Sequence, residues 1–178
     1  MQLVLPNLEV LEVRDINVAK IWHNQISAVM SCNVQNLTSL VVEDCCKLRY
    51  VFSYSTAKRL EQLQHLVISR CPLLEEIVGK EGGVEADPSF VFPQLTILKL
   101  SSLPELRAFY PGIHTLECPI LTKLEVSFCH KLESFSSEPP SLFTEKVGEQ
   151  TSFSYIITTT ATTRTHIETT TLIAACAP

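Results

Sequence analysis

Cysteine and histidine are the residues of this chain that could support covalent or metal chemistry. There are five histidines and seven cysteines, the latter at positions 32, 45, 46, 71, 118, 129 and 176. They form no C-x-x-C pair and show none of the spacings that hold zinc, so the sequence predicts no metal site. The adjacent Cys129 and His130, together with the distant His65, could instead suggest a thiol hydrolase.

A cysteine nucleophile needs a positioned base and a third group that orients this base. Cys129 occupies an inward position of the repeat described below, and the side chain of His130 should point away from it. We interpret Cys45 and Cys46 as one core cysteine beside one turn cysteine, in preference to a redox pair. The sequence therefore predicts a protein that is not an enzyme, with no catalytic residue and no cofactor.

One run of charged side chains could also be considered as a metal site. It consists of Glu75, Glu76, Lys80, Glu81, Glu85 and Asp87. Nothing in the sequence fixes the geometry that a hard cation requires, so a solvated surface is the better interpretation.

The overall composition excludes several classes of partner. Hydrophobic residues make up 46% of the chain and charged residues 19%, which is enough apolar material for a packed core. The net charge is −5, and the 14 basic residues form no cluster, so we expect no nucleic-acid binding. No apolar run is long enough to cross a bilayer, and no signal peptide is recognisable. We therefore expect reduced thiols and a cytoplasmic protein without membrane insertion.

An internal repeat with apolar residues at i, i+3, i+5, i+8, i+11 and i+14 organises most of the sequence. Its clean copies start at Leu37, Leu63, Leu95 and Leu121, and a degenerate copy starts at Leu8 and continues to Ala19 and Trp22. Three copies have Cys at i+8, namely Cys45, Cys71 and Cys129. Five aligned copies of one apolar pattern indicate a repeat protein.

The template has a simple physical interpretation. The i+3 and i+5 residues have strand periodicity, so they point to one face while their neighbours point to the other. The i+8 thiol turns inward where the strand ends and can face backbone groups of the turn. The i+11 and i+14 residues bring the returning segment over the core. One repeat cannot bury its own apolar side, so the copies must stack.

The predicted fold class is therefore α/β: a leucine-rich-repeat solenoid, a short parallel-sheet horseshoe of about five repeats. Residues 1–137 form the array, 138–150 a linker or partial repeat, and 151–178 a Thr-rich disordered tail, because the tail has no template match to specify a strand register. Between copies, residues 55–64 are expected to form a helix with Ser55 or Thr56 as N-cap, and residues 79–89 an exposed loop.

The concave face of the array is the predicted protein-binding surface. Its solvent-facing positions are i+2, i+4, i+6 and i+7, and several carry apolar residues, which points to a contact surface. The alternative is ordinary scattered surface residues. The residues selected for binding are Ser39, Val41, Glu43, His65, Val67, Arg70, Ile97, Lys99, Lys123, Glu125 and Phe128.

Several stretches resemble the C-terminal repeats of plant intracellular disease-resistance receptors, which combine a coiled coil, a nucleotide-binding NB-ARC module and leucine-rich repeats. The stretches are LTSLVVEDCCKLRYVFSYSTAKRLEQLQHLVISRCPLLEEIV (37–78), FVFPQLTILKLSSLPELRAFYPGIHT (90–115) and CPILTKLEVSFCHKLESF (118–135). The resemblance covers roughly residues 1–150. It implies binding of a protein partner: a pathogen effector, a guarded host protein, or the receptor's own nucleotide-binding module.

The sequence also departs from that family. It has no G-x-x-x-x-G-K-[ST] phosphate loop and no coiled-coil heptads, and dedicated caps are absent at both ends of the array, so a fragment without the nucleotide switch is expected. Two alternatives stay open. One is a substrate adaptor of the ubiquitin system, which should have an F-box and an I-T-D pattern after the Cys, whereas K-L or P-L-L follows here. The other is a non-functional truncated gene product.

Overall fold

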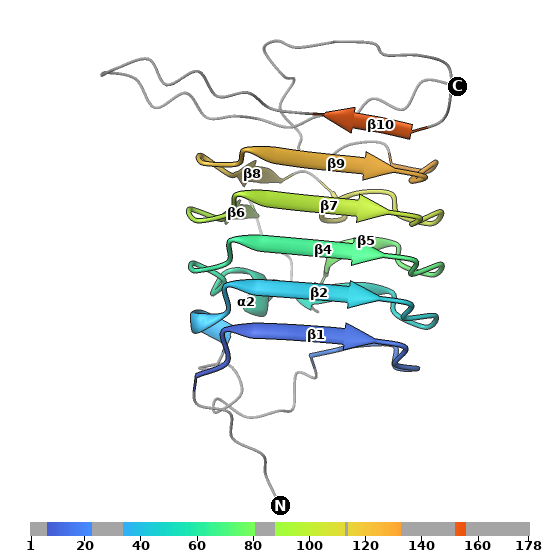
Figure 1. Cartoon of the computed structure of the whole chain (residues 1–178), viewed down its shortest axis with the longest axis horizontal. Helices are drawn as coiled ribbons and strands as arrows, with labels where there is room; N and C mark the ends of the chain where they lie inside the picture. Colours follow the sequence, from blue (N-terminus) through green and yellow to red (C-terminus); the bar gives the residue numbers. More distant parts are fainter. Residues whose placement is uncertain (1–6, 23–33, 81–87, 113, 133–151, 156–178) are drawn as a thin grey trace, which may run out of the picture.

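The computed structural model of the 178-residue chain describes residues 7–22, 34–80, 88–112, 114–132 and, for the backbone, 152–155. In these ranges the chain winds through stacked turns, each with one strand in a common sheet (Figure 1). The main sheet has the order β1-β2-β4-β7-β9-β10. Its parallel strands are β1 (Val10–Arg14), β2 (Ser39–Glu43), β4 (His65–Ser69), β7 (Ile97–Ser101) and β9 (Lys123–Ser127). This confirms the predicted parallel-sheet solenoid.

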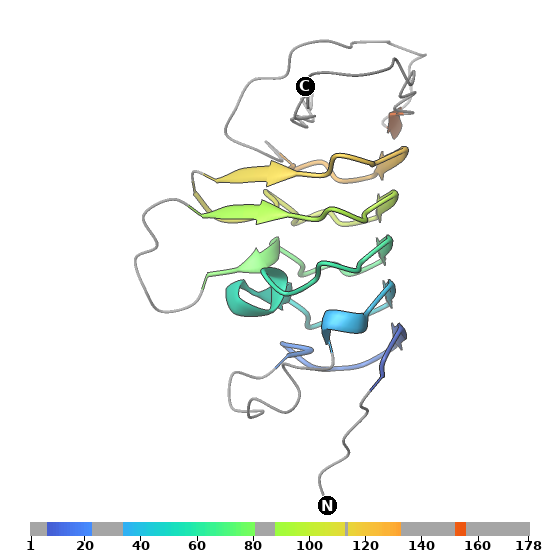
Figure 2. The ribbon, with the colours of Figure 1, turned by 90° about the vertical axis from the view of Figure 1, so that its left-hand side faces the viewer.

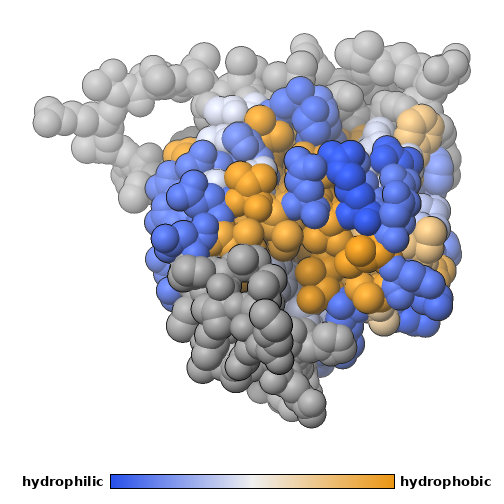
Figure 3. Space-filling view, turned by 60° about the horizontal axis from the view of Figure 1, so that its bottom comes forward, coloured by the Kyte–Doolittle hydropathy of each residue, from blue (hydrophilic) through white to orange (hydrophobic). Residues whose placement is uncertain are grey.

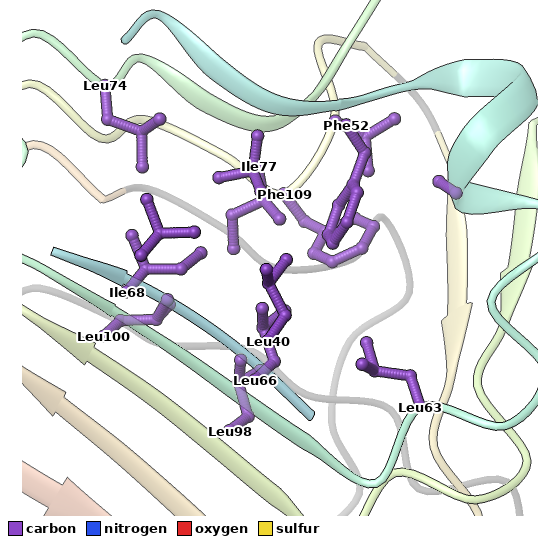
Figure 4. Packing of buried hydrophobic residues seen from close by; sticks show 14 of the residues in the cluster. Leu40, Phe52, Leu63, Leu66, Ile68, Leu74, Ile77, Leu98, Leu100 and Phe109 are labelled. Carbon is purple, nitrogen blue, oxygen red and sulfur yellow. The ribbon is translucent and has the colours of Figure 1, made fainter. Parts of the chain in front are cut away.

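The apolar template accounts for the core. The six template residues of the copies that begin at Leu37, Leu63 and Leu95 have exposed fractions of 2% or less. Figure 4 shows how side chains from successive strands, such as Leu40, Leu66 and Leu98, lie beside one another. Because neighbouring strands pair without a register shift, each template residue is covered by the same position of the next repeat.

The first repeat departs from the template. Leu8, Leu11 and Ile16 are only half-buried, and Ala19 is exposed instead of lying inward. Trp22 is buried, with an exposed fraction of 9%. The last template position, Phe135, lies outside the described residues. The degeneracy seen in the sequence of this copy thus corresponds to incomplete burial.

The inward cysteines cap the strand ends as predicted. The thiol of Cys45 donates to the carbonyl of Glu43 at 3.3 Å, and that of Cys71 to the carbonyl of Ser69 at 3.3 Å. In the last repeat Cys129 donates to the carbonyl of Ser127 at 3.4 Å. All three thiols are buried, and none of them forms a disulfide with another described cysteine. One small apolar side chain thereby fills the turn and satisfies a backbone acceptor.

A conformational feature recurs just before these inward positions. The i+7 residue of every repeat has a positive φ, between 52° and 57°. These residues are Asp15, Asp44, Arg70, Ser102 and Phe128. The left-handed conformation turns the chain sharply out of the strand, although none of the five is glycine.

The returning segments form short elements on the other side of the core (Figure 2). Two small parallel sheets pair β3 (Tyr50–Ser53) with β5 (Glu76–Gly79), and β6 (Ser89–Val91) with β8 (Thr115–Glu117). A 3-10 helix, η1 (Val34–Asn36), precedes β2. No helix among the described residues is long and apolar enough to span a membrane.

The predicted helix over 55–64 requires correction. The structure has only the four-residue α2 (Tyr54–Ala57), and its N-cap is Ser53, whose Oγ accepts from the backbone N–H of Thr56 at 3.3 Å. Ser53 ends β3, so the strand passes directly into the cap. The amphipathic pattern beyond residue 57 instead reflects buried Leu60 and Leu63, which lead the chain back to the sheet.

The predicted exposed loop at 79–89 also has different ends. Gly79 is the buried last residue of β5, Pro88 is buried, and Ser89 begins β6. The middle of this segment, residues 81–87, lies outside the described residues.

Strand β10 (Ser152–Tyr155) extends the sheet and pairs antiparallel with β9. Its four residues belong to the Thr-rich segment 151–178 that we expected to be disordered, and this expectation stays a prediction because the other residues of the segment lie outside the described part. Residues 133–151 and 156–178 lie outside the described part. The boundaries at 137 and 150 therefore stay predictions.

Candidate protein-binding surface

The outward side of the main sheet, here called the sheet face, carries the residues selected from the sequence. The strand register places the i+2 residues in one column, which runs Val10, Ser39, His65, Ile97, Lys123. The i+4 residues form a second column, which runs Glu12, Val41, Val67, Lys99, Glu125. Both columns match the order expected from the template.

All eleven selected residues reach the surface to some extent. His65, Arg70 and Phe128 are exposed, and the other eight are half-buried. Phe128 is an aromatic side chain with an exposed fraction of 49%. Ser69, a neighbouring sheet-face position, is buried, and its hydroxyl donates to Oε1 of Glu43 at 3.3 Å. The structure brings the selected residues together on one surface, and binding by this surface stays a prediction.

An acidic cluster with two arginines covers the N-terminal part of the sheet face. Arg14 contacts Glu43 at 2.7 Å and Glu12 at 3.3 Å, which connects β1 to β2. Arg70 forms a two-pronged pair with Asp44, with Nε–Oδ1 at 2.7 Å and Nη2–Oδ2 at 2.8 Å. The hydrogen bond from Arg70 lowers the pKa of Asp44, and Asp44 in turn raises the pKa of Arg70. Both side chains therefore stay charged at neutral pH.

A second ionic cluster lies at the other end, on β7 and β9. Glu125 accepts from Lys123 at 2.6 Å and from Lys99 at 2.9 Å. The hydrogen bonds from Lys123 and Lys99 lower the pKa of Glu125, while the bond to Glu125 raises that of Lys123. Two lysines share one carboxylate, so the cluster has a net charge of +1. These pairs lie at the surface, where ion pairs contribute little to stability and chiefly order the side chains.

Three apolar side chains separate the two ionic clusters. Val41 and Val67 are paired neighbours on β2 and β4, and Ile97 lies diagonally on β7 beside His65. All three are half-buried. We call Val41, Val67 and Ile97 the apolar patch. An apolar centre with charged groups around it is the usual organisation of a protein-binding surface.

Hydroxyl side chains make a further serine pair and a ladder of threonine bonds between repeats, which sequence reasoning did not identify. Ser127 Oγ donates to Ser101 Oγ at 3.0 Å on the sheet face. At the i+1 position, Thr38 Oγ1 donates to the Glu9 carbonyl at 2.9 Å, and Thr96 and Thr122 donate to the preceding repeat in the same way. The recurrence of Thr at i+1 is visible in the sequence and could have revealed the threonine ladder.

The neighbouring residues considered for thiol chemistry differ in their burial. Cys129 is buried with its thiol on a carbonyl, and His130 is exposed. Burial raises the pKa of Cys45, and it raises the pKa of Cys71 and of Cys118 to about 12, so these thiols are protonated at neutral pH. Within the described part of the chain, no group of three His, Cys, Asp or Glu residues could hold a metal ion.

Comparisons with known proteins agree with this architecture. Residues 7–143 match the family described as plant disease resistance protein RPS2-like, leucine-rich repeats. The chain is 30% identical over 155 residues to the probable disease resistance protein At4g27220 of Arabidopsis thaliana. This alignment covers 86% of the chain and 16% of that protein. The chain is 28% identical over 142 residues to the probable disease resistance protein At5g47260 of the same plant, covering 75% and 14%. The chain thus spans about a sixth of the length of these relatives. No solved structure gives a significant match.

Proposed function

Since the chain belongs to the leucine-rich-repeat family of RPS2-like plant disease resistance proteins, we propose that it is a non-catalytic recognition module whose sheet face binds another protein. The apolar patch between two ionic clusters is the observation that carries this proposal. Its residues come from three strands that the repeat holds in register. A rigid surface of this kind can bind a partner without first being ordered.

The charges suggest how a partner would be oriented. The N-terminal cluster holds Glu12, Asp15, Glu43 and Asp44 against Arg14 and Arg70, a net charge of −2, while the cluster of Lys99, Lys123 and Glu125 has +1. A partner with the opposite polarity along the sheet would be favoured in one orientation, and its reverse would be disfavoured. The three candidate partners are a pathogen effector, a guarded host protein and the nucleotide-binding module of a longer receptor.

We also propose a cytoplasmic location and the role of a sensing fragment. The inward thiols of Cys45, Cys71 and Cys129 bond to backbone carbonyls, an arrangement that needs reduced cysteines and that a reducing compartment would maintain. The chain spans only a fraction of the length of its relatives, so the nucleotide switch of the longer receptors would be supplied by other residues than those in this sequence.

A photo-crosslinking experiment in plant cells tests the sheet face as the binding surface. A photoreactive residue replaces Val67 on the apolar patch or, as the matched control, Glu61, which is exposed and lies outside the main sheet between α2 and β4. We expect a discrete protein adduct from position 67 only, and its yield should fall when Lys99→Glu is added. Equal adducts from both positions, or an adduct insensitive to Lys99→Glu, would contradict the proposal.

A further inference from the structure

Basic side chains that are scattered in the sequence gather where the chain leaves the main sheet, in the turns on the right of Figure 1. They occupy the i+10 and i+12 positions of the repeat, which we call the exit ridge. The i+10 column runs Val18, Lys47, Leu73, Glu105, Lys131. The i+12 column runs Lys20, Arg49, Glu75, Arg107, and its last member, Glu133, lies outside the described residues. In Figure 3, where this edge is again on the right, hydrophilic and apolar residues lie side by side.

Two ion pairs show that equivalent ridge positions of successive repeats lie within reach of each other. In the i+10 column, Lys131 Nζ is 2.7 Å from Glu105 Oε2. In the i+12 column, Arg49 Nη1 is 2.6 Å from Glu75 Oε1. Each pair joins adjacent repeats, so the stacking that builds the main sheet also aligns the ridge.

The exit ridge has an excess of positive charge. Its nine described residues include five cations and two carboxylates, a net charge of +3 in a chain whose net charge is −5. The half-buried Glu76, which borders the ridge in β5, lowers the local charge to +2. Both ridge carboxylates already pair with a cation. Lys47 and Arg107 form no ion pair in the described part of the chain, and both are exposed.

An apolar side chain lies between these two cations. Leu73 has an exposed fraction of 46%, although the template residues on either side of it, Cys71 and Leu74, are fully buried. Lys47 occupies the same column one repeat earlier, and Arg107 belongs to the ridge one repeat later. A single exposed leucine is common on protein surfaces, but this one is flanked by cations that no described carboxylate neutralises. The ridge therefore offers an apolar contact together with positive charge.

We propose that the exit ridge binds an extended acidic protein segment that carries an apolar side chain between its carboxylates. Lys47 and Arg107 are two repeats apart, which is about 10 Å along the array for strands that are about 4.8 Å apart. An extended segment covers this distance with about three residues, so an acidic, apolar, acidic pattern fits the ridge. Leu73 favours a protein segment, because a simple anion would have no use for an apolar contact.

The exit ridge is distinct from the sheet face, and its central residues belong to the second, third and fourth repeats. The inference therefore does not depend on the proposed function of the sheet face. Opposite charges would steer the acidic segment to the ridge, and the apolar contact would hold it there.

Fluorescence anisotropy of a labelled peptide, Gly-Glu-Glu-Leu-Glu-Glu-Gly, titrated with the full chain tests the chemistry of the partner. We expect saturable binding that weakens as salt is added. A peptide with Lys in place of Glu should not bind, and one with Ser in place of Leu should bind roughly tenfold more weakly. The inference is overturned if the acidic peptide shows no saturation up to millimolar chain, or if the Ser peptide binds equally well.

Charge reversal tests the location of the site. Lys47→Glu and Arg107→Glu should each weaken peptide binding by roughly tenfold, with thermal midpoints close to that of the unchanged chain because both side chains are exposed. The matched control is Lys80→Glu, an exposed cation that follows β5 outside the ridge, and it should bind like the unchanged chain. Equal weakening by Lys80→Glu would show that overall charge attracts the peptide, and would overturn the inference.

A vesicle assay separates a protein partner from an anionic membrane. The full chain is sedimented with vesicles of phosphatidylcholine containing one-third phosphatidylserine, and we expect it to stay in the supernatant. Co-sedimentation that Lys47→Glu abolishes would assign the ridge to a lipid surface and overturn the inference.

Discussion

The ring of Tyr50 lies so close to Gly79 that a Cβ atom added at position 79 would be 2.5 Å from Tyr50 Cγ. Tyr50 begins β3 and Gly79 ends β5, two strands that pair on the return side of the core. The hydrogen side chain of glycine is therefore required here by space and not by backbone conformation.

Gly79→Ala should lower the free energy of unfolding by about 1–3 kcal/mol, because the added methyl group overlaps an aromatic ring in a packed region. Urea denaturation of both proteins measures the difference. In a Tyr50→Ala background the same substitution should cost little. If the full cost remains there, the contact with Tyr50 is not its cause.

Leu98 and Lys99 are neighbours on β7, and substitutions at the two positions should differ in their cost to the free energy of unfolding. Leu98 is 1% exposed, so Leu98→Ala should cost roughly 2–5 kcal/mol through lost burial and a cavity. Lys99 is half-buried and pairs with Glu125, so Lys99→Glu should cost about 1 kcal/mol or less. Thermal and urea unfolding provide the comparison. A larger loss for Lys99→Glu than for Leu98→Ala would contradict the assigned strand faces.

Phe128 combines a left-handed backbone, with φ of 54°, and an exposed aromatic ring. Asparagine adopts this conformation more readily, so Phe128→Asn should raise the free energy of unfolding by about 0.5–1 kcal/mol. The β-branched control Phe128→Val should lower it. Denaturant midpoints of the unchanged chain and the two variants measure these differences. A loss of stability in Phe128→Asn would show that the aromatic ring stabilises the fold by more than the left-handed backbone of Phe128 costs.

The ion pairs of the sheet face predict a stability that declines in acid. Asp44 and Glu125 have pKa values lowered by Arg70 and by Lys123 with Lys99. Their contribution is complete above the ordinary values of 3.8 and 4.5 and is lost as the pH falls through the lower, folded-state values. Thermal midpoints measured from pH 7 down to about 3 should fall less steeply for Glu125→Gln than for the unchanged chain. An identical slope would contradict the assignment.

The charge on Glu76 should lower the stability of the folded protein, in contrast to the charges on Asp44 and Glu125. Burial and the nearby Glu75 raise the pKa of its carboxyl. The charged form is thus disfavoured in the folded state, and this penalty is present at neutral pH and removed as the pH falls through the raised pKa. Glu76→Gln should therefore increase the thermal midpoint at pH 7 and change it little near pH 4. An increase of equal size at both pH values would show that packing, not charge, is responsible.

The sequence template predicted the strands, their register and the buried positions. It could do so because every stacked repeat must turn the same positions of the chain toward the shared core. The same local pattern could not predict the pairs Arg70–Asp44 and Lys123–Glu125, since these depend on which rotamers meet across or along strands. The left-handed column was also missed. Asp, Arg, Ser and Phe at this position share no side-chain property, and the turn of the solenoid imposes the conformation on them.

The wrong helix prediction at 55–64 has a local cause. A period of three to four residues in this segment was interpreted as a helix, but it also suits a chain that alternately touches and leaves a core, as Leu60 and Leu63 do. For β10, antiparallel pairing with β9 supplies a register that the parallel template could not indicate. Whether the sheet-face residues bind a partner was a prediction from the sequence and still is.

The unequal lengths of the repeats have a consequence for how such surfaces can diversify. The copies at Leu63 and Leu95 start 32 residues apart and those at Leu37 and Leu63 start 26 apart, yet β4–β7 and β2–β4 pair in the same register. In the sequence, the extra residues fall between β5 and β6, two strands of the return side. Insertions and deletions there leave the spacing of sheet-face side chains unchanged. Changes of length are thus confined to the return side. The sheet face varies by substitution of side chains whose positions the strand register holds fixed.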